Sequence, residues 1–386
     1  IAELIDRRMD VCMEEQPEEF PQTLGERLKL HRELFDSFRR LDILQELVDD
    51  PRVTEIMVNG PDQVFVETGG KIGRWEKSFE SREQLEDLIQ QIVSSVNRIV
   101  NTSMPLADAR LSDGSRVHVV LEPIALNGPI LTIRKFPEPM TMERLLDYGS
   151  ISPEAADLLK TLVAARYNIF VSGGTGAGKT TFLNALSEFI PPGERVITIE
   201  DAAELQLNHI ENLVRMETRE ANAEGAGAIG IGELIRAALR MRPDRLIIGE
   251  VRGKEALDLL QSLNTGHDGG FSSGHANSVK DMLSRLETMV LMAADLPLAA
   301  IRSQIASAVD IMVHVSRMRD KTRKVTAIEE VDRFENGEII LNPLFTFREA
   351  EKAGDGFGNT GKVEGSLEQI GTLKHREKLR LAGYRV

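Results

Sequence analysis

The sequence predicts an α/β protein in which a mostly parallel, doubly wound sheet follows a smaller α/β domain. Three features of the chain support this prediction. Short β-rich runs separated by turn signals fill residues 51–136, and a proline-rich break follows at 137–150. Beyond it, over residues 151–352, apolar strands alternate with helices. Such alternation is typical of a parallel sheet that is covered by helices on both faces.

The N-terminal part is expected to contain a helical segment and then the small α/β domain. In residues 1–50, leucine and phenylalanine recur at roughly helical spacing among charged residues. From Val53, the runs VTEIMVNG, QVFVET and KIGRWE are separated by Asn-Gly, Gly-Gly and Pro-Asp signals, as hairpins are. Ser81 is expected to open a helix that continues to about Ile99. Further strands are expected in RVHVVLEPI and ILTIRKF.

The C-terminal part shows the alternation of strands and helices. The prolines of KFPEPM end the strand pattern, so we place a flexible linker at 137–150. The elements expected after it are a helix at 153–166, the strand NIFVS, a helix from Lys179, the strand VITIE, a helix from about Glu233 and the strand RLIIGE. A hairpin is expected to turn at Asn336-Gly337. Residues 353–386 are expected to form a flexible glycine-rich connection and a short terminal helix.

Composition argues against several functional classes. With 41% hydrophobic and 28% charged residues among 386, the chain is expected to be globular rather than disordered or collagen-like. Its most apolar stretches, 246–251 and 289–301, do not supply the ~20 apolar residues of a spanning helix, so no transmembrane segment is expected. A formal charge of −14 argues against a surface that holds duplex nucleic acid. Because Cys12 is the single cysteine, an intramolecular disulfide or a cysteine zinc site is excluded.

A glycine-rich loop follows the strand that ends at Val171. Residues 173–180 read GGTGAGKT and satisfy the pattern G-x-x-x-x-G-K-[ST] between a strand and a helix. Glycines let the backbone N–H groups turn inward, and the helix N-terminus adds positive charge, so the loop can cradle a polyphosphate. Lys179 is expected to reach the β- and γ-phosphates, and the Thr180 hydroxyl to bind Mg²⁺. The candidate nucleotide-binding residues are Gly174, Thr175, Gly176, Ala177, Gly178, Lys179, Thr180 and Thr181.

Acidic residues follow two of the predicted strands. Glu250 ends RLIIGE, where it could lie beside Mg²⁺ and its waters, although Gly249 precedes it where many phosphate-loop enzymes have Asp. The alternative is a buried strand followed by a capping glutamate. A second cluster, residues 200–204 (EDAAE), follows VITIE at the carboxyl edge of the sheet, where the phosphates would bind. One of its acids could position the attacking water, or Asp201 could simply cap a helix.

Histidines and arginines in polar surroundings are further candidates. His267 and His275 both lie among Gly, Ser and Thr, and no third metal ligand is evident, so a hydrogen bond to the γ-phosphate or to a carboxylate is favoured. Arg110, Arg116 and Arg134 lie on polar-apolar strands just before the linker. Each is either an ordinary solvated strand residue or a phosphate ligand. Their clustering allows one or two of them to act as arginine fingers.

Taken together, the motifs resemble those of the secretion-ATPase superfamily. GGTGAGKT, ITIEDAAEL, LIIGEVRG and TGHDGG…SSGHANS correspond to its Walker A loop, Asp box, atypical Walker B and His box, and DMLSRLETMVLMAADLP is also similar. Residues 245–317 are most similar to the CpaF-type ATPases of tight-adherence (Tad, type IVc) pili, and the resemblance covers roughly residues 25–350. It implies a RecA-like P-loop NTPase domain joined by a flexible linker to a smaller N-terminal α/β (PAS-like) domain, with nucleotide bound between the two.

The resemblance also implies an activity and partners. It implies a homo-hexameric ATPase that uses ATP and Mg²⁺ and powers pilus assembly together with platform proteins of the inner membrane. Such a protein is cytoplasmic, lies at the inner face of that membrane and is not expected to bind nucleic acid directly. TGHDGG and SGHANS favour the pilus branch. The alternatives are a type IV secretion traffic ATPase that moves DNA or effector proteins, and a nucleotide-dependent assembly scaffold that hydrolyses little.

Carried over residue by residue, the resemblance gives each motif a role. The catalytic carboxylate is expected in the Asp box, with Glu204 as first choice and Glu200 as second. The other roles that the resemblance implies are nucleotide and Mg²⁺ binding by Lys179 and Thr180, a Walker B role beside Mg²⁺, partly through water, for Glu250, a His-box role for His275, and phosphate contact by Arg110, Arg116 or Arg134.

Overall fold

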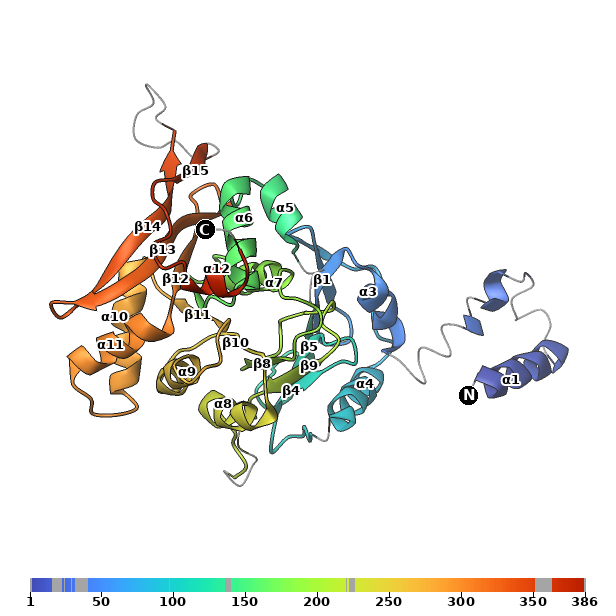
Figure 1. The fold of residues 1–386 in the computed structure, drawn as a ribbon. Helices are drawn as coiled ribbons and strands as arrows, with labels where there is room; N and C mark the ends of the chain where they lie inside the picture. The colour runs from blue at the N-terminus through green and yellow to red at the C-terminus, as the bar shows by residue number, and fades with distance from the viewer. Residues whose placement is uncertain are drawn as a thin grey trace. The chain divides into compact units, whose positions relative to one another are not determined.

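The computed structural model describes residues 2–15, 41–96, 98–135, 140–219, 226–350 and 363–384, together with residues 23, 25–28, 30, 31 and 221. The chain divides into two compact units, Ile1–Glu138 and Pro139–Val386. In Figure 1 the first unit is coloured blue to teal and the second green to red. The boundary between the units lies inside the predicted linker.

The first unit is built on an antiparallel sheet. Its six strands have the order β3-β2-β1-β6-β5-β4, and they are β1 (Val53–Asn59), β2 (Val64–Thr68), β3 (Lys71–Arg74), β4 (Leu106–Arg110), β5 (Arg116–Val120) and β6 (Ile130–Arg134). Its helical elements are α1 (Ala2–Glu15), η1 (Asp42–Leu44), α3 (Gln45–Asp49) and α4 (Arg82–Ser95). The strands predicted from composition and turn signals are present. Arg110 was expected on a strand, but the bounds of β4 were not predicted, because its sequence LADAR has no β-branched or aromatic residue.

Helix α4 packs on this sheet through one apolar face. The Ser81 hydroxyl caps its start by accepting from Gln84 N at 3.2 Å. Leu85, Ile89 and other apolar residues at helical spacing are buried with residues of the strands in one hydrophobic cluster. The helix ends at Ser95, four residues before the predicted end. In its last turn the Ser95 hydroxyl donates to the Ile92 carbonyl, a local bond that competes with helix continuation.

The second unit contains a nine-stranded sheet of the order β15-β14-β13-β12-β7-β11-β10-β8-β9. Its strands are β7 (Ile169–Gly173), β8 (Val196–Glu200), β9 (Leu213–Glu217), β10 (Arg245–Ile248), β11 (Phe271–His275), β12 (Ile311–Arg317), β13 (Arg323–Glu335), β14 (Glu338–Glu349) and β15 (Gly365–Gln369). The strands from β12 to β9 are parallel, which confirms the predicted parallel sheet, and β13 to β15 extend it as antiparallel neighbours. The hairpin turns at Asn336 and Gly337, whose φ angles of 52° and 83° are those of a tight hairpin turn.

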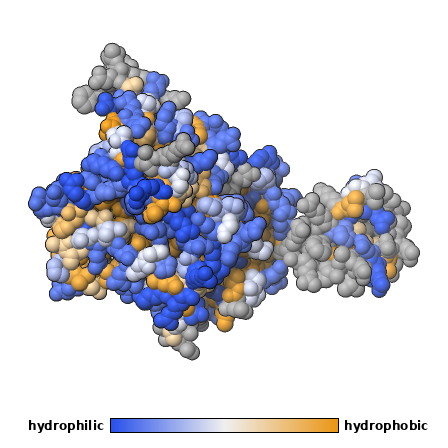
Figure 2. Space-filling model, viewed as in Figure 1, coloured by the Kyte–Doolittle hydropathy of each residue, from blue (hydrophilic) through white to orange (hydrophobic). Residues whose placement is uncertain are grey.

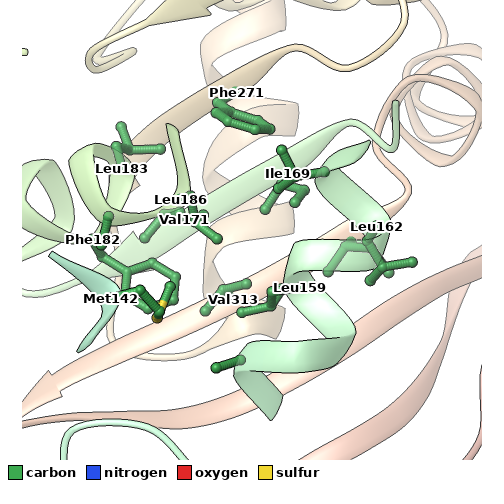
Figure 3. Close-up of a cluster of buried hydrophobic side chains, with 14 of the residues drawn as sticks. Met142, Leu159, Leu162, Ile169, Val171, Phe182, Leu183, Leu186, Phe271 and Val313 are labelled. Carbon is green, nitrogen blue, oxygen red and sulfur yellow. The ribbon is translucent and has the colours of Figure 1, made fainter. Parts of the chain in front are cut away.

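Helices cover both faces of this sheet. They are α5 (Met142–Asp147), α6 (Pro153–Ala164), α7 (Lys179–Ser187), α8 (Ile231–Ala238), η2 (Leu239–Met241), α9 (Glu255–Leu263), α10 (Val279–Leu291), α11 (Leu298–Ala308) and α12 (Glu377–Leu381). Along β7, Ile169 and Val171 belong to one buried cluster with α6 and α7, whereas Phe170 belongs to the other with α9, α10 and α11. Figure 3 shows the first cluster, where Leu159 and Phe182 lie near Val171. This alternation is that of a strand buried on both faces.

Two predicted connections differ from the structure. Residues 142–147 of the predicted linker form α5, because Thr141 caps the helix by accepting from Arg144 N and because Met142 and Leu145 are buried in the core of the second unit. Most of the predicted glycine-rich connection lies outside the described residues. The terminal segment then adds β15 to the sheet before the predicted short helix, α12.

The described surface shows where the apolar side chains remain exposed. On the face shown in Figure 2, hydrophilic residues dominate, and an apolar patch lies over α10 and α11. Leu291, Met292 and Leu298 at the turn between these helices are exposed. In the part of the chain that the structure describes, no helix combines the length and the apolar character that a membrane crossing requires.

Candidate nucleotide-binding site

The phosphate loop lies at the carboxyl end of β7 and leads directly into α7, as predicted. A Cβ at Gly173 would lie 2.3 Å from the Val315 carbonyl oxygen of the neighbouring strand β12, so only glycine fits there. Gly176 and Gly178 have φ angles of 70° and 96°, which other residues rarely adopt. The crest of the loop at Thr175 and Gly176 is exposed. Glycine is therefore required at position 173 by the close approach of β12, and at positions 176 and 178 by their positive φ angles.

The side chain of Lys179 folds back inside the loop. Its Nζ lies 3.3 Å from the carbonyl oxygens of Gly173 and Gly174 and 3.0 Å from His275 Nδ1. The residue is 7% exposed. Burial lowers the pKa of Lys179, and the nearby carboxylate of Glu250 opposes that shift. A cation is thus held where the phosphates of a bound nucleotide would lie.

His275, at the end of β11, lies between Lys179 and Glu250. Its Nε2 lies 2.9 Å from Glu250 Oε1. Burial lowers the pKa of His275, with Glu250 opposing that shift, so the ring is neutral near pH 7. The tautomer that fits accepts from Lys179 at Nδ1 and carries its hydrogen on Nε2. Arg252 lies 3.1 Å from Glu250 Oε2 and 3.9 Å from Asp201 Oδ2, which extends the network to the Asp box.

These residues fit a nucleotide with its magnesium ion. Glu250 Oε1 is buried and, although His275 Nε2 is close, it has no aligned hydrogen-bond partner in the described part of the chain. A buried carboxylate oxygen in that position can accept a metal-bound water. The Thr180 hydroxyl, at the start of α7, and Glu250 are the residues that would hold Mg²⁺. Among the described residues, no group of three His, Cys, Asp or Glu side chains could hold a metal ion by itself.

Glu200, the last residue of β8, is an anchor for the Asp box. It is 3% exposed, and its Oε1 accepts from the backbone N–H groups of Glu204 at 2.9 Å and Leu205 at 3.1 Å. A Cβ at Gly249 would lie 2.9 Å from Glu200 Cγ. The glycine before Glu250, which the sequence presented as a departure from the usual Walker B pattern, thus makes room for Glu200. Glu204 is half-buried.

Burial raises the pKa of Glu200 from 4.5 to about 7. The folded protein therefore holds a proton between about pH 4.5 and 7 that the unfolded chain has lost, and stability is expected to fall as pH rises through this window. Above pH 7 the cost reaches at most about 3 kcal/mol. Glu200→Gln should flatten this part of the profile and raise the melting temperature at pH 8, measured by thermal unfolding from pH 5 to 8. An unchanged profile would contradict the assignment.

The three candidate arginines form a row in the first unit. Arg110 on β4 lies opposite Arg116 on β5, and Arg116 lies opposite Arg134 on β6. Directly opposed residues on antiparallel strands share one face. Glu55 of β1 lies on the other side of Arg134. The sequence predicted the cluster, and the strand register explains how residues 24 positions apart come together.

The structure brings one of the two candidate histidines to the phosphate loop. His275 ends β11 beside the phosphate loop, whereas His267 precedes that strand, at the opposite edge of the sheet. The only hydrogen bond of His267 within the described residues is a long one of 3.5 Å with Thr265. Sequence analysis also missed Arg252, although its position two residues after Glu250 in GEVRG was a usable signal.

The chain is similar to known secretion-system proteins over most of its length. The family model described as Type II/IV secretion system protein matches residues 39–344. A Mycobacterium tuberculosis protein named for conjugal transfer is 39% identical over 293 residues, which cover 74% of this chain and 83% of that protein. The type IV secretion system protein PtlH of Bordetella pertussis is 35% identical over 291 residues, which cover 69% and 86% of the two chains.

A solved structure shares the fold. The pilus retraction motor PilT with bound ADP superposes with a TM-score of 0.56 at 18% identity, over 78% of this chain and 80% of that one. The likeness confirms the predicted fold class, in which an N-terminal domain precedes a RecA-like ATPase domain. The motifs, the family match and the relatives lead to one conclusion: the chain belongs to the Type II/IV secretion system protein family.

Proposed function

We propose that the protein is a motor that hydrolyses ATP to ADP and phosphate. The observation that carries this proposal is the connection from Lys179 through His275 to Glu250, built at the mouth of a glycine loop. A loop that served only to bind phosphate would not need a histidine and a buried carboxylate behind its lysine. The arrangement supplies a cation for the γ-phosphate and a carboxylate for its metal ion, as phosphoryl transfer requires.

Each residue then has a stated role. Lys179 stabilises the charge that develops on the γ-phosphate, and His275 keeps the ammonium group of Lys179 in place. Thr180 and Glu250 would hold Mg²⁺, which would supply positive charge against the phosphates. Glu204 accepts a proton from the attacking water. The scaffold alternative is tested by ATP turnover with and without Mg²⁺: magnesium-dependent release of phosphate is expected, and ADP binding without turnover would favour the scaffold.

The arginine row is proposed to complete the site when the linker bends. The guanidinium groups of Arg110, Arg116 and Arg134 lie on one sheet face, and their planar geometry suits phosphate oxygens. Because the row and the phosphate loop belong to different units, we propose that bending of the linker, or a neighbouring subunit, brings the arginines to the nucleotide. We therefore propose a homo-hexameric ring. The exposed apolar turn between α10 and α11 is a surface of the kind that assembly covers.

Removing the row should slow turnover but spare binding. In the triple variant Arg110→Ala, Arg116→Ala and Arg134→Ala, turnover is expected to fall by about 10²-fold or more, because arginine fingers act on charge that develops in the transition state. ADP affinity, measured by titration of a fluorescent analogue, should change much less. Sedimentation should still show a ring for the wild type. Full activity from the triple variant as a monomer would refute both the ring and the finger.

The machine that this motor drives is proposed from resemblance. The His-box sequences favour assembly of tight-adherence pili, with the ATPase at the inner face of the inner membrane and in contact with platform proteins. The relatives named for conjugal transfer and type IV secretion favour the alternative, a traffic ATPase that moves DNA or effector proteins. Deletion of the gene separates the two. Loss of surface pili with normal DNA transfer supports the first, and the reverse supports the second.

A further inference from the structure

Besides Lys179, a second positively charged side chain contacts the phosphate loop. It belongs to Arg323 and lies outside the loop. Arg323 is the first residue of β13, and its Nε donates to the Gly176 carbonyl oxygen over 3.0 Å. Its side-chain methylenes cover the end of the loop, since a Cβ at Gly178 would lie 3.2 Å from Arg323 Cδ. Arg323 lies in none of the four motifs, more than 140 residues after the loop.

The contact fixes one peptide plane of the loop. The Ala177 N–H donates to the Gly174 carbonyl at 3.3 Å, and the carbonyl of the same plane, that of Gly176, accepts from Arg323. In a trans peptide these two groups point in opposite directions, so the plane is held from both sides. Gly176 has the conformational freedom to let this plane rotate. A rotated carbonyl would present partial negative charge to the phosphates and weaken their binding.

Hydrogen bonds fix the turn between β12 and β13, which precedes Arg323. Asp320 accepts from the Thr322 backbone N–H at 3.0 Å and from the Val363 N–H at 2.7 Å. Arg319 donates to Glu349 of β14 at 2.8 Å. These bonds fix the turn between β12 and β13 to β14 and to the terminal segment. Arg323 is therefore presented by a fixed element rather than by a free surface loop.

We propose that Arg323 is a positioning residue for hydrolysis: its hydrogen bond to Gly176 holds the phosphate loop in the conformation that binds the nucleotide's phosphates. The inference rests on the proposed ATPase function. Lys179 holds the carbonyls of Gly173 and Gly174 from inside the loop, and Arg323 holds the next part of the loop from outside. The two cations thus leave the loop's inward amides available for an anion.

Side-chain length gives a sharp test. In Arg323→Gln the amide nitrogen occupies the same place along the side chain as the arginine Nε, so the donor is kept and the charge is lost. Arg323→Met removes both. Arg317→Met is the matched control, because Arg317 is the cross-strand neighbour of Arg323, is exposed and has no recorded bond to the loop in the described part of the chain. The measurements are amide hydrogen exchange of residues 173–180 without nucleotide, ADP affinity and steady-state turnover.

Arg323→Met is expected to speed exchange of the loop and to weaken ADP binding, each by about tenfold. Arg323→Gln should recover most of both, and Arg317→Met should match the wild type. If Arg323→Met leaves exchange and affinity unchanged, the proposal is overturned. It is also overturned if the Gln variant is as defective as the Met variant, because charge would then matter rather than the bond to Gly176. A wild type without turnover would contradict the proposed ATPase, yet the exchange comparison would still decide the role of Arg323.

Discussion

Lys179→Ala is expected to abolish ATP hydrolysis, with turnover reduced by about 10³-fold or more. The variant keeps the backbone cradle of the loop but loses the cation that meets charge developing on the γ-phosphate. It also loses the hydrogen bond that Lys179 donates to His275 Nδ1. His275 is then free to turn away from Glu250, so the Walker B carboxylate is disturbed as well. Phosphate release under saturating ATP measures the effect.

The matched control for this variant is Lys160→Ala. Lys160 is an exposed lysine on α6 in the same unit, and its removal should leave turnover within about twofold of the wild type. ADP affinity, measured beside turnover, shows whether the Lys179→Ala variant still binds nucleotide. Lys179→Ala with retained but weakened ADP binding fits the proposed role, whereas wild-type turnover from this variant would remove the basis for the whole assignment of the site.

The parts of this fold that follow a local rule could be predicted from the sequence. The strand–loop–helix around Lys179 depends on glycine conformations and on the apolar run before it, both of which lie within a dozen residues. The hairpin turn at Asn336-Gly337 is local in the same sense. In each case the residue types permit few other backbone conformations. The phosphate loop around Lys179 could therefore be predicted from residues that are close to it in the sequence.

The parts of the site that depend on strand order could not be predicted. The contact between Gly249 and Glu200 exists because β10 pairs with β8. The contact between Arg323 and Gly176 exists because β13 pairs with β12, which in turn pairs with β7. No sequence pattern states which strands become neighbours. His267 lies away from the phosphate loop for the related reason that strand β11 separates it from His275, and one strand is enough to move a residue to the opposite edge of a sheet.

Glu204→Gln is expected to bind ATP with near-normal affinity and to lose turnover by about 10²-fold or more. Glutamine is close to glutamate in shape, so the Asp box keeps its conformation, but an amide cannot accept the proton of the attacking water. Glu204 is the Asp-box glutamate whose carboxylate is not buried in the strand, and its backbone N–H is fixed by Glu200 at 2.9 Å. Single-turnover kinetics with bound ATP separate this chemical defect from a binding defect.

Glu200→Gln should behave differently, and the contrast is the sharpest test of the site. Glu200 is buried and holds backbone N–H groups through Oε1, a bond that the glutamine carbonyl also makes. Turnover should therefore remain within a few-fold of the wild type at pH 7. Stability should rise at alkaline pH, because the glutamine side chain carries no charge to bury. If Glu200→Gln instead abolishes turnover while Glu204→Gln stays active, the catalytic carboxylate is the buried one. Its raised pKa would then belong to a general base rather than to an anchor.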